Sequence, residues 1–102
     1  MNIIAVDDEK IALRDLEYTI RKACEQLANE QADISQAVLT CFNMADEAIP
    51  FARENDVHIA FLDINMGGMN GIELAENLKK INDKTNIVFS TVNENYGCSV
   101  QG

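Results

Sequence analysis

Four short stretches of mainly apolar residues are spaced along the chain. They cover residues 2–6, 37–42, 57–62 and 86–90. Runs of this length that are bounded by polar residues are typical of strands. In the third run the residues from Ile59 to Leu62 are apolar without a break. This predicts a strand that is buried on both faces, as in a parallel sheet covered by helices.

The segments between these runs have apolar residues at every third or fourth position, which is typical of amphipathic helices. The first segment begins near Lys10 and predicts a helix of about five turns. Its apolar stripe is formed by Leu13, Leu16, Ile20, Ala23 and Leu27. The last segment also predicts a helix, because Ile72, Leu74, Ala75, Leu78 and Ile81 recur with helical spacing.

The middle segment predicts a helix with a less regular sequence. Asn43 is a residue type that often caps a helix N-terminus, and it precedes an apolar pattern formed by Ala45, Ala48, Ile49 and Ala52. Pro50 falls inside this pattern. Because proline lacks the backbone donor, we expect it to kink or shorten the helix.

Strands that alternate with helices predict an α/β fold with a doubly wound parallel sheet. We expect one domain over residues 1–102, in which residues 93–102 form an irregular tail. Right-handed crossovers place the C-terminal ends of all parallel strands at one rim of the sheet. Polar residues that follow the strands should therefore lie close together.

The charge of the chain restricts its partners. Seventeen acidic and eight basic side chains give a net charge of −9, which argues against direct binding to nucleic acid or to an anionic membrane. No apolar run is long enough to span a membrane, and no basic leader precedes the first strand, so we expect a cytoplasmic protein. Three scattered cysteines indicate neither a disulfide framework nor a zinc site.

The candidate chemistry lies at the C-terminal ends of three predicted strands. Asp7 and Asp8 follow the first strand, Asp63 follows the third and Thr91 follows the fourth. Any one aspartate there could be an ordinary turn residue. Together, clustered carboxylates repel one another and favour a cation, and oxygen ligands alone favour Mg²⁺ or Mn²⁺. A carboxylate beside such an ion can accept a phosphoryl group.

The same residues resemble the receiver domain of bacterial two-component response regulators. The similarity runs from residues 3–9 through residues 61–71 to residues 87–91, and so extends over nearly the whole chain except its tail. It implies a flavodoxin-like sheet with strand order 2-1-3-4, from which the fifth strand and fifth helix are missing. It also implies a signalling module rather than an enzyme.

The resemblance assigns a role to each candidate residue. Asp63 corresponds to the phospho-acceptor that takes its phosphoryl group from a histidine kinase. Asp7 and Asp8 correspond to the acidic pair that holds Mg²⁺, with the backbone carbonyl of Asn65 as a further ligand. Thr91 corresponds to the switch hydroxyl. Residues 87–96 are also similar to regulators in which a LytTR-type DNA-binding domain follows the receiver, so an output domain of that kind would be absent from this chain.

Two features depart from the family pattern. Gly67 stands where the family usually has proline, and the sequence ends at Gly102 before the fifth strand and its lysine. Lys84 precedes the fourth strand and should lie at the opposite rim. Without that lysine the negative charge of a phosphoryl group should be poorly stabilised. The strand at residues 86–90 should be an uncovered edge, which predicts self-association or exchange of an element between protomers.

Two alternatives therefore remain open. The chain could be a receiver with a disabled switch that acts as a self-associating interaction module. It could also be a Mg²⁺-dependent phosphatase that uses Asp63 as its nucleophile, although no second acid for leaving-group protonation is evident. His58, the only histidine, should lie far from the carboxylates and have a structural or solvated role.

Overall fold

The computed structural model describes residues 1–28, 37–66 and 69–90. Four strands and three helices occur within these ranges. The strands are β1 (Asn2–Val6), β2 (Val38–Phe42), β3 (Val57–Asp63) and β4 (Asn86–Ser90), and the helices are α1 (Lys10–Ala28), α3 (Ala45–Glu54) and α4 (Gly71–Ile81). All neighbouring strands are parallel, in the order β2-β1-β3-β4. The predicted fold class and strand order are therefore confirmed.

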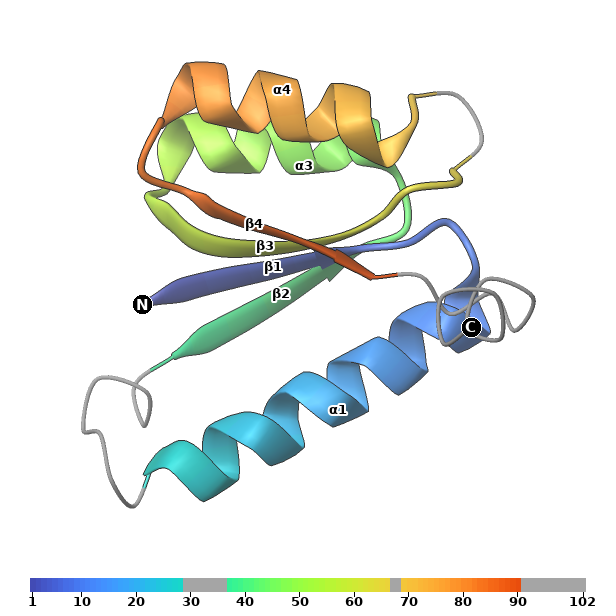
Figure 1. Cartoon of the computed structure of the whole chain (residues 1–102), viewed down its shortest axis with the longest axis vertical. Helices are drawn as coiled ribbons and strands as arrows, with labels where there is room; N and C mark the ends of the chain where they lie inside the picture. Colours follow the sequence, from blue (N-terminus) through green and yellow to red (C-terminus); the bar gives the residue numbers. More distant parts are fainter. Residues whose placement is uncertain (29–36, 67–68, 91–102) are drawn as a thin grey trace, which may run out of the picture.

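The helices cover both faces of the sheet. Helices α3 and α4 lie side by side on one face, and α1 lies on the other (Figure 1). A hydrophobic core lies on each face of the sheet. Alternate residues of β1 contribute to one core or the other, because successive side chains of a strand point to opposite faces. Ile4 and Val6 are fully buried against α3 and α4, whereas Ile3 and Ala5 pack toward α1.

The apolar stripe of α1 was predicted over too long a segment. Leu16 and Ile20 are buried, but Ala23 and Leu27 are exposed. A helix of 19 residues is about 28 Å long, whereas a strand of five residues covers only about 17 Å. The last turns of α1 therefore extend past the sheet, and the sequence pattern could not show where the sheet ends.

The start of α3 also differs from the prediction. Met44, not Asn43, occupies the N-cap position, and its side chain makes no capping hydrogen bond. Asn43 lies one residue too early, and the acidic residues Asp46 and Glu47 in the first turn interact favourably with the helix dipole instead. The helix continues through Pro50 to Glu54, so the expected shortening is wrong.

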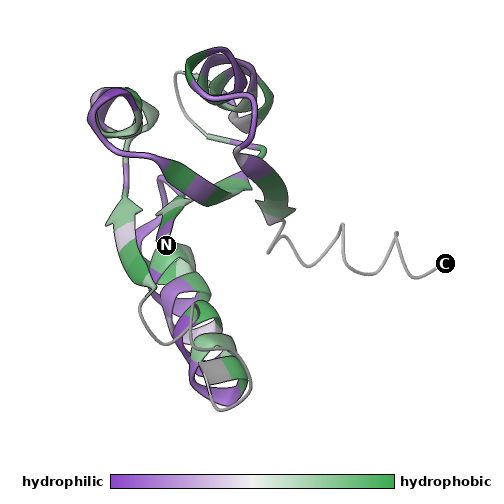
Figure 2. Ribbon diagram, turned by 90° about the vertical axis from the view of Figure 1, so that its left-hand side faces the viewer, coloured by the Kyte–Doolittle hydropathy of each residue, from purple (hydrophilic) through white to green (hydrophobic). Residues whose placement is uncertain are grey.

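Strand β4 is the edge of the described sheet. Among the strands that the structure describes it pairs with β3 alone, and its side chains Val88 and Phe89 are 41% and 43% exposed. Helix α1 packs against β1 and β2 and does not reach beneath β4, as the view in Figure 2 shows. Val88, on the α1 face of the sheet, is thus open to solvent, whereas Phe89 lies on the opposite face and lines a shallow pocket beside α4. The predicted tail at 93–102 lies outside the described residues.

Among the helices that the structure describes, none combines the length and the hydropathy needed to cross a bilayer.

Candidate functional site

The candidate site lies at the carboxyl rim, which is defined here as the C-terminal ends of β1, β3 and β4. Val6 near the end of β1 is paired in register with Leu62 near the end of β3. Asp7 and Asp63 directly follow these two residues and therefore lie at the ends of neighbouring strands at this rim. One carboxylate oxygen from each of Asp7, Asp8 and Asp63 lies within 4.8 Å of the others. The structure thus brings together the three carboxylates whose convergence the topology predicted.

The backbone fixes the innermost of these side chains. The backbone N–H of Asp7 donates to the carbonyl of Phe42 at 3.1 Å, which extends the β1–β2 pairing by one residue. The carboxylate of Asp7 accepts a bond from the backbone N–H of Glu9 at 3.0 Å. This local turn holds Asp7 inward and leaves Asp8 exposed at the mouth of the site.

Burial and mutual repulsion disfavour the charged form of these carboxylates. Asp7 is only 1% exposed, and burial raises its pKa from 3.8 to about 6, aided by the nearby charges of Asp63 and Asp8 and opposed by the Glu9 N–H. The pKa of Asp63 is also raised, chiefly by burial and then by Asp8, while hydrogen bonds from the Asn65 backbone and the Asp7 side chain lower it. Binding of a proton or a cation should therefore stabilise the site.

The donor set fits a small hard cation. All three side chains offer carboxylate oxygens, and within the part of the chain that the structure describes neither histidine nor cysteine joins the cluster. Such ligands suit Mg²⁺ or Mn²⁺, which are usually held by one or two carboxylates together with carbonyls and waters. Asn65 lies two residues after Asp63 with an exposed side chain, and its backbone N–H bonds to the Asp63 carboxylate.

The predicted switch residue Thr91 lies outside the described residues. Its neighbour Ser90 is the last residue of β4 and is paired in register with Asp63. The C-terminal end of β4 thus lies directly beside Asp63, the last residue of β3.

Two residues at the site were missed by sequence reasoning. Glu9 supplies the N–H that holds Asp7, and its own charge raises the pKa of both Asp7 and Asp63. Its position in the run Asp7-Asp8-Glu9 was a usable signal. Gly71, the first residue of α4, packs against the backbone of Asp63. A glycine at the start of a helix gave only a weak hint of this contact.

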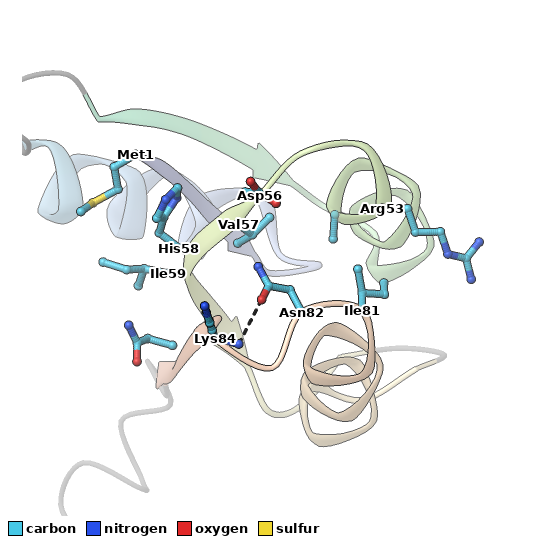
Figure 3. A pocket seen from close by; sticks show the side chains of 11 residues that line it. Met1, Arg53, Asp56, Val57, His58, Ile59, Ile81, Asn82 and Lys84 are labelled. Atoms are coloured by element: carbon cyan, nitrogen blue, oxygen red, sulfur yellow. Dashed lines mark hydrogen bonds between the residues drawn. The ribbon is translucent and has the colours of Figure 1, made fainter.

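A separate pocket of about 670 Å³ lies at the amino rim, which is the N-terminal ends of β1, β3 and β4 (Figure 3). Its lining includes His58, Asn82 and Lys84. His58 accepts a bond from the backbone N–H of Asn2 through Nδ1 at 3.0 Å, which fits the expected structural role. Lys84 also lies at this rim, as predicted. The pocket is remote from the three clustered carboxylates and is not the candidate site for phosphoryl chemistry.

Comparisons with known proteins identify the fold and the family. The model of the response regulator receiver domain matches residues 3–101. The sensory transduction protein LytT of Bacillus subtilis is 27% identical over 96 residues, which cover 94% of this chain and 36% of LytT. A response regulator receiver domain protein from Clostridium thermocellum superposes with a TM-score of 0.69 at 15% identity, over 98% of this chain and 71% of that one.

A further structural neighbour is the response regulator protein TrrA of Thermotoga maritima, which was solved in complex with Mg²⁺–BeF. Its TM-score is 0.59 at 22% identity, over 97% of this chain and 76% of that chain. The chain spans only about a third of the length of the curated relatives that it matches. With nearly every residue inside the family match and the strand order shared, the chain belongs to the response regulator receiver domain family.

Proposed function

We propose that this receiver domain accepts a phosphoryl group on Asp63 from the phosphohistidine of a histidine kinase. One observation supports the proposal most strongly: the Asp63 carboxylate lies at the open end of a central strand, within 4.8 Å of the carboxylates of Asp7 and Asp8. In the reaction an Asp63 oxygen forms a bond to phosphorus while the histidine N–P bond breaks. The nitrogen takes the electron pair, and Asp63 becomes an aspartyl phosphate.

Each residue has a distinct part in this proposal. Asp63 is partly exposed, so a phosphodonor can reach it. Asp7 is buried, so its role is limited to that of a ligand inside the site. Asp7, Asp8, Asp63 and the backbone carbonyl of Asn65 would hold Mg²⁺, which offsets the charge of the incoming phosphoryl oxygens. The complex of TrrA with Mg²⁺–BeF supports this assignment by analogy. Thr91, next to Ser90, is proposed as the hydroxyl that responds to the phosphoryl group.

The test is to incubate the protein with Mg²⁺ and a small phosphodonor such as acetyl phosphate and to detect the adduct by mass spectrometry. We expect an acid-stable, base-labile adduct that requires Mg²⁺ and is absent in Asp63→Asn. Asp56→Asn is the matched control, because Asp56 is an exposed aspartate at the opposite end of the same strand. An adduct that persists in Asp63→Asn would refute the proposal.

The partners follow from the same proposal. The chain matches about a third of LytT, and the sequence of residues 87–96 resembles regulators with a LytTR-type output domain. We propose that residues 1–102 act as a single receiver that controls an output domain, of the DNA-binding LytTR type, in the cytoplasm. The receiver itself, with a net charge of −9, is not expected to contact DNA.

A second function, self-association, is favoured by one observation. Strand β4 has an unpaired side within the described sheet and exposes Val88 and Phe89. A second copy could pair with this strand through backbone hydrogen bonds. Sedimentation velocity over a range of concentrations tests this. We expect a dimer that Val88→Lys weakens, while a monomer at all concentrations would refute self-association.

A further inference from the structure

Gly71 makes an unusually close approach to the main chain of the proposed phospho-acceptor. A Cβ atom built on Gly71 would lie 2.9 Å from the carbonyl carbon of Asp63, 3.0 Å from the Cα of Ile64 and closer still to the Asp63 carbonyl oxygen. All three atoms belong to the backbone, so no side-chain rotation could relieve the overlap. The backbone of Gly71 is not in the left-handed region, so it is space rather than conformation that requires glycine here.

A hydrogen bond reinforces this contact. The backbone N–H of Gly71 donates to the carbonyl of Ile64 at 2.9 Å. The bond joins the first residue of α4 to the residue that follows Asp63, and so closes the connection between β3 and α4 at its base. The end of β3 and the start of α4 are thereby held in one fixed arrangement.

The rest of α4 has little freedom to move away. Leu74 and Leu78 are buried in the core between α4 and the sheet. The side chain of Asn70 caps the helix by accepting the backbone N–H of Glu73 at 2.8 Å. An added Cβ at position 71 would therefore displace the Asp63–Asn65 segment at the rim, whose residues are only partly buried or exposed. Normal contact distances require a shift on the order of 1 Å.

We propose that Gly71 is a positioning residue that fixes the backbone position of Asp63 and the orientation of its carboxylate at the carboxyl rim. The inference rests on the phospho-acceptor role proposed above for Asp63. Gly71 itself is not proposed to bind the metal or the phosphoryl group. It acts through the carbonyl of Asp63 and the carbonyl of Ile64, and thereby fixes the carboxylate of Asp63 and the backbone of Asn65 relative to Asp7 and Asp8.

A purely helical role for Gly71 predicts the opposite result. Alanine is a better helix former than glycine, so Gly71→Ala in an uncrowded first turn would stabilise the protein. The close approach to Asp63 predicts instead that the substitution distorts the rim. The direction of the effect therefore separates the two interpretations.

The experiment compares Gly71→Ala with Asn70→Ala in the full chain. Asn70→Ala loosens the same end of the same helix by removing the cap, but adds no atom near Asp63. Amide NMR spectra should show shifted Asp63 and Ile64 signals only in Gly71→Ala. The rate of adduct formation with acetyl phosphate should fall about 100-fold in Gly71→Ala, the size expected for a displacement of about 1 Å. In Asn70→Ala it should stay within about threefold, because a lost cap leaves the reacting geometry intact.

The outcomes distinguish failure of this inference from failure of the proposed function. Unchanged Asp63 and Ile64 amide signals in Gly71→Ala, or equal losses in both variants, would overturn the positioning role. If the wild type forms no adduct, the proposed function fails, and Mg²⁺ affinity measured by calorimetry still tests positioning: it must drop in Gly71→Ala and persist in Asn70→Ala. If Gly71→Ala is unfolded in buffer, the same spectra are recorded in trimethylamine oxide, which favours the compact state.

Discussion

The two rims of the sheet carry polar groups that are organised in opposite ways. At the amino rim the polar groups satisfy one another: Asn2 bonds to His58 through its backbone and to the Asp56 carbonyl through its side chain. Thr85, which is 1% exposed, donates to the carbonyl of Val57 at 2.7 Å. At the carboxyl rim three carboxylates of like charge lie within 4.8 Å of one another.

This difference separates structural from functional polar residues. Paired polar groups stabilise the native state in the absence of any ligand. Carboxylates that are crowded together destabilise it until a proton or a cation arrives, as the raised pKa values of Asp7 and Asp63 indicate. Substitutions at the amino rim should therefore reduce stability and leave metal binding intact, whereas substitutions at the carboxyl rim should do the reverse.

The largest effect is expected from Asp7→Asn without Mg²⁺. A pKa raised from 3.8 to about 6 means that Asp7 favours folding below pH 4 and that this contribution is lost as the pH rises to 6. Removing the charge should stabilise the protein at pH 7 by about 3 kcal/mol. Urea unfolding from pH 4 to 8 measures this. The wild type should lose stability across that window and the variant should lose much less, with Asp56→Asn as a control that behaves like the wild type.

The second prediction concerns the ion itself. Free Mg²⁺ at 100 times its dissociation constant should stabilise the wild type by about 2.7 kcal/mol, because it binds the folded state alone. Asp7→Asn should lose most of this gain, since it removes a charged ligand from the cluster. Thermal unfolding with Mg²⁺ and with a chelator provides the measurement. Equal stabilisation of both proteins would place the ion elsewhere on the molecule.

At the amino rim, Thr85→Val should reduce the stability of the protein. Thr85→Val keeps the side-chain shape but leaves the carbonyl of Val57 without its buried donor. The expected cost is about 2 kcal/mol, within the range for an unsatisfied buried polar group. Mg²⁺ affinity, measured by calorimetry on the same sample, should not change. A loss of Mg²⁺ affinity would show that the two rims are coupled.

Much of this arrangement could be predicted from the sequence, but the environments of some residues could not. The convergence of Asp7 and Asp63 follows from topology alone, because parallel strands end at the same rim. The exposure of Ala23 and Leu27 depends on the length of the sheet relative to α1, which helical spacing does not encode. The need for glycine at position 71 arises from a close approach between two backbones, and no local pattern reports such a distance.

The smallest effect is expected for His58→Ala. His58 is exposed, and its Nδ1 accepts the backbone N–H of Asn2, a donor that water can satisfy once the imidazole is gone. The loss should therefore be about 0.5 kcal/mol, the low end for a hydrogen bond. Urea unfolding at pH 8 measures it, and Mg²⁺ affinity and adduct formation should match the wild type. A reduced rate of adduct formation would give the amino rim a part in the chemistry, and the division between the two rims would then fail.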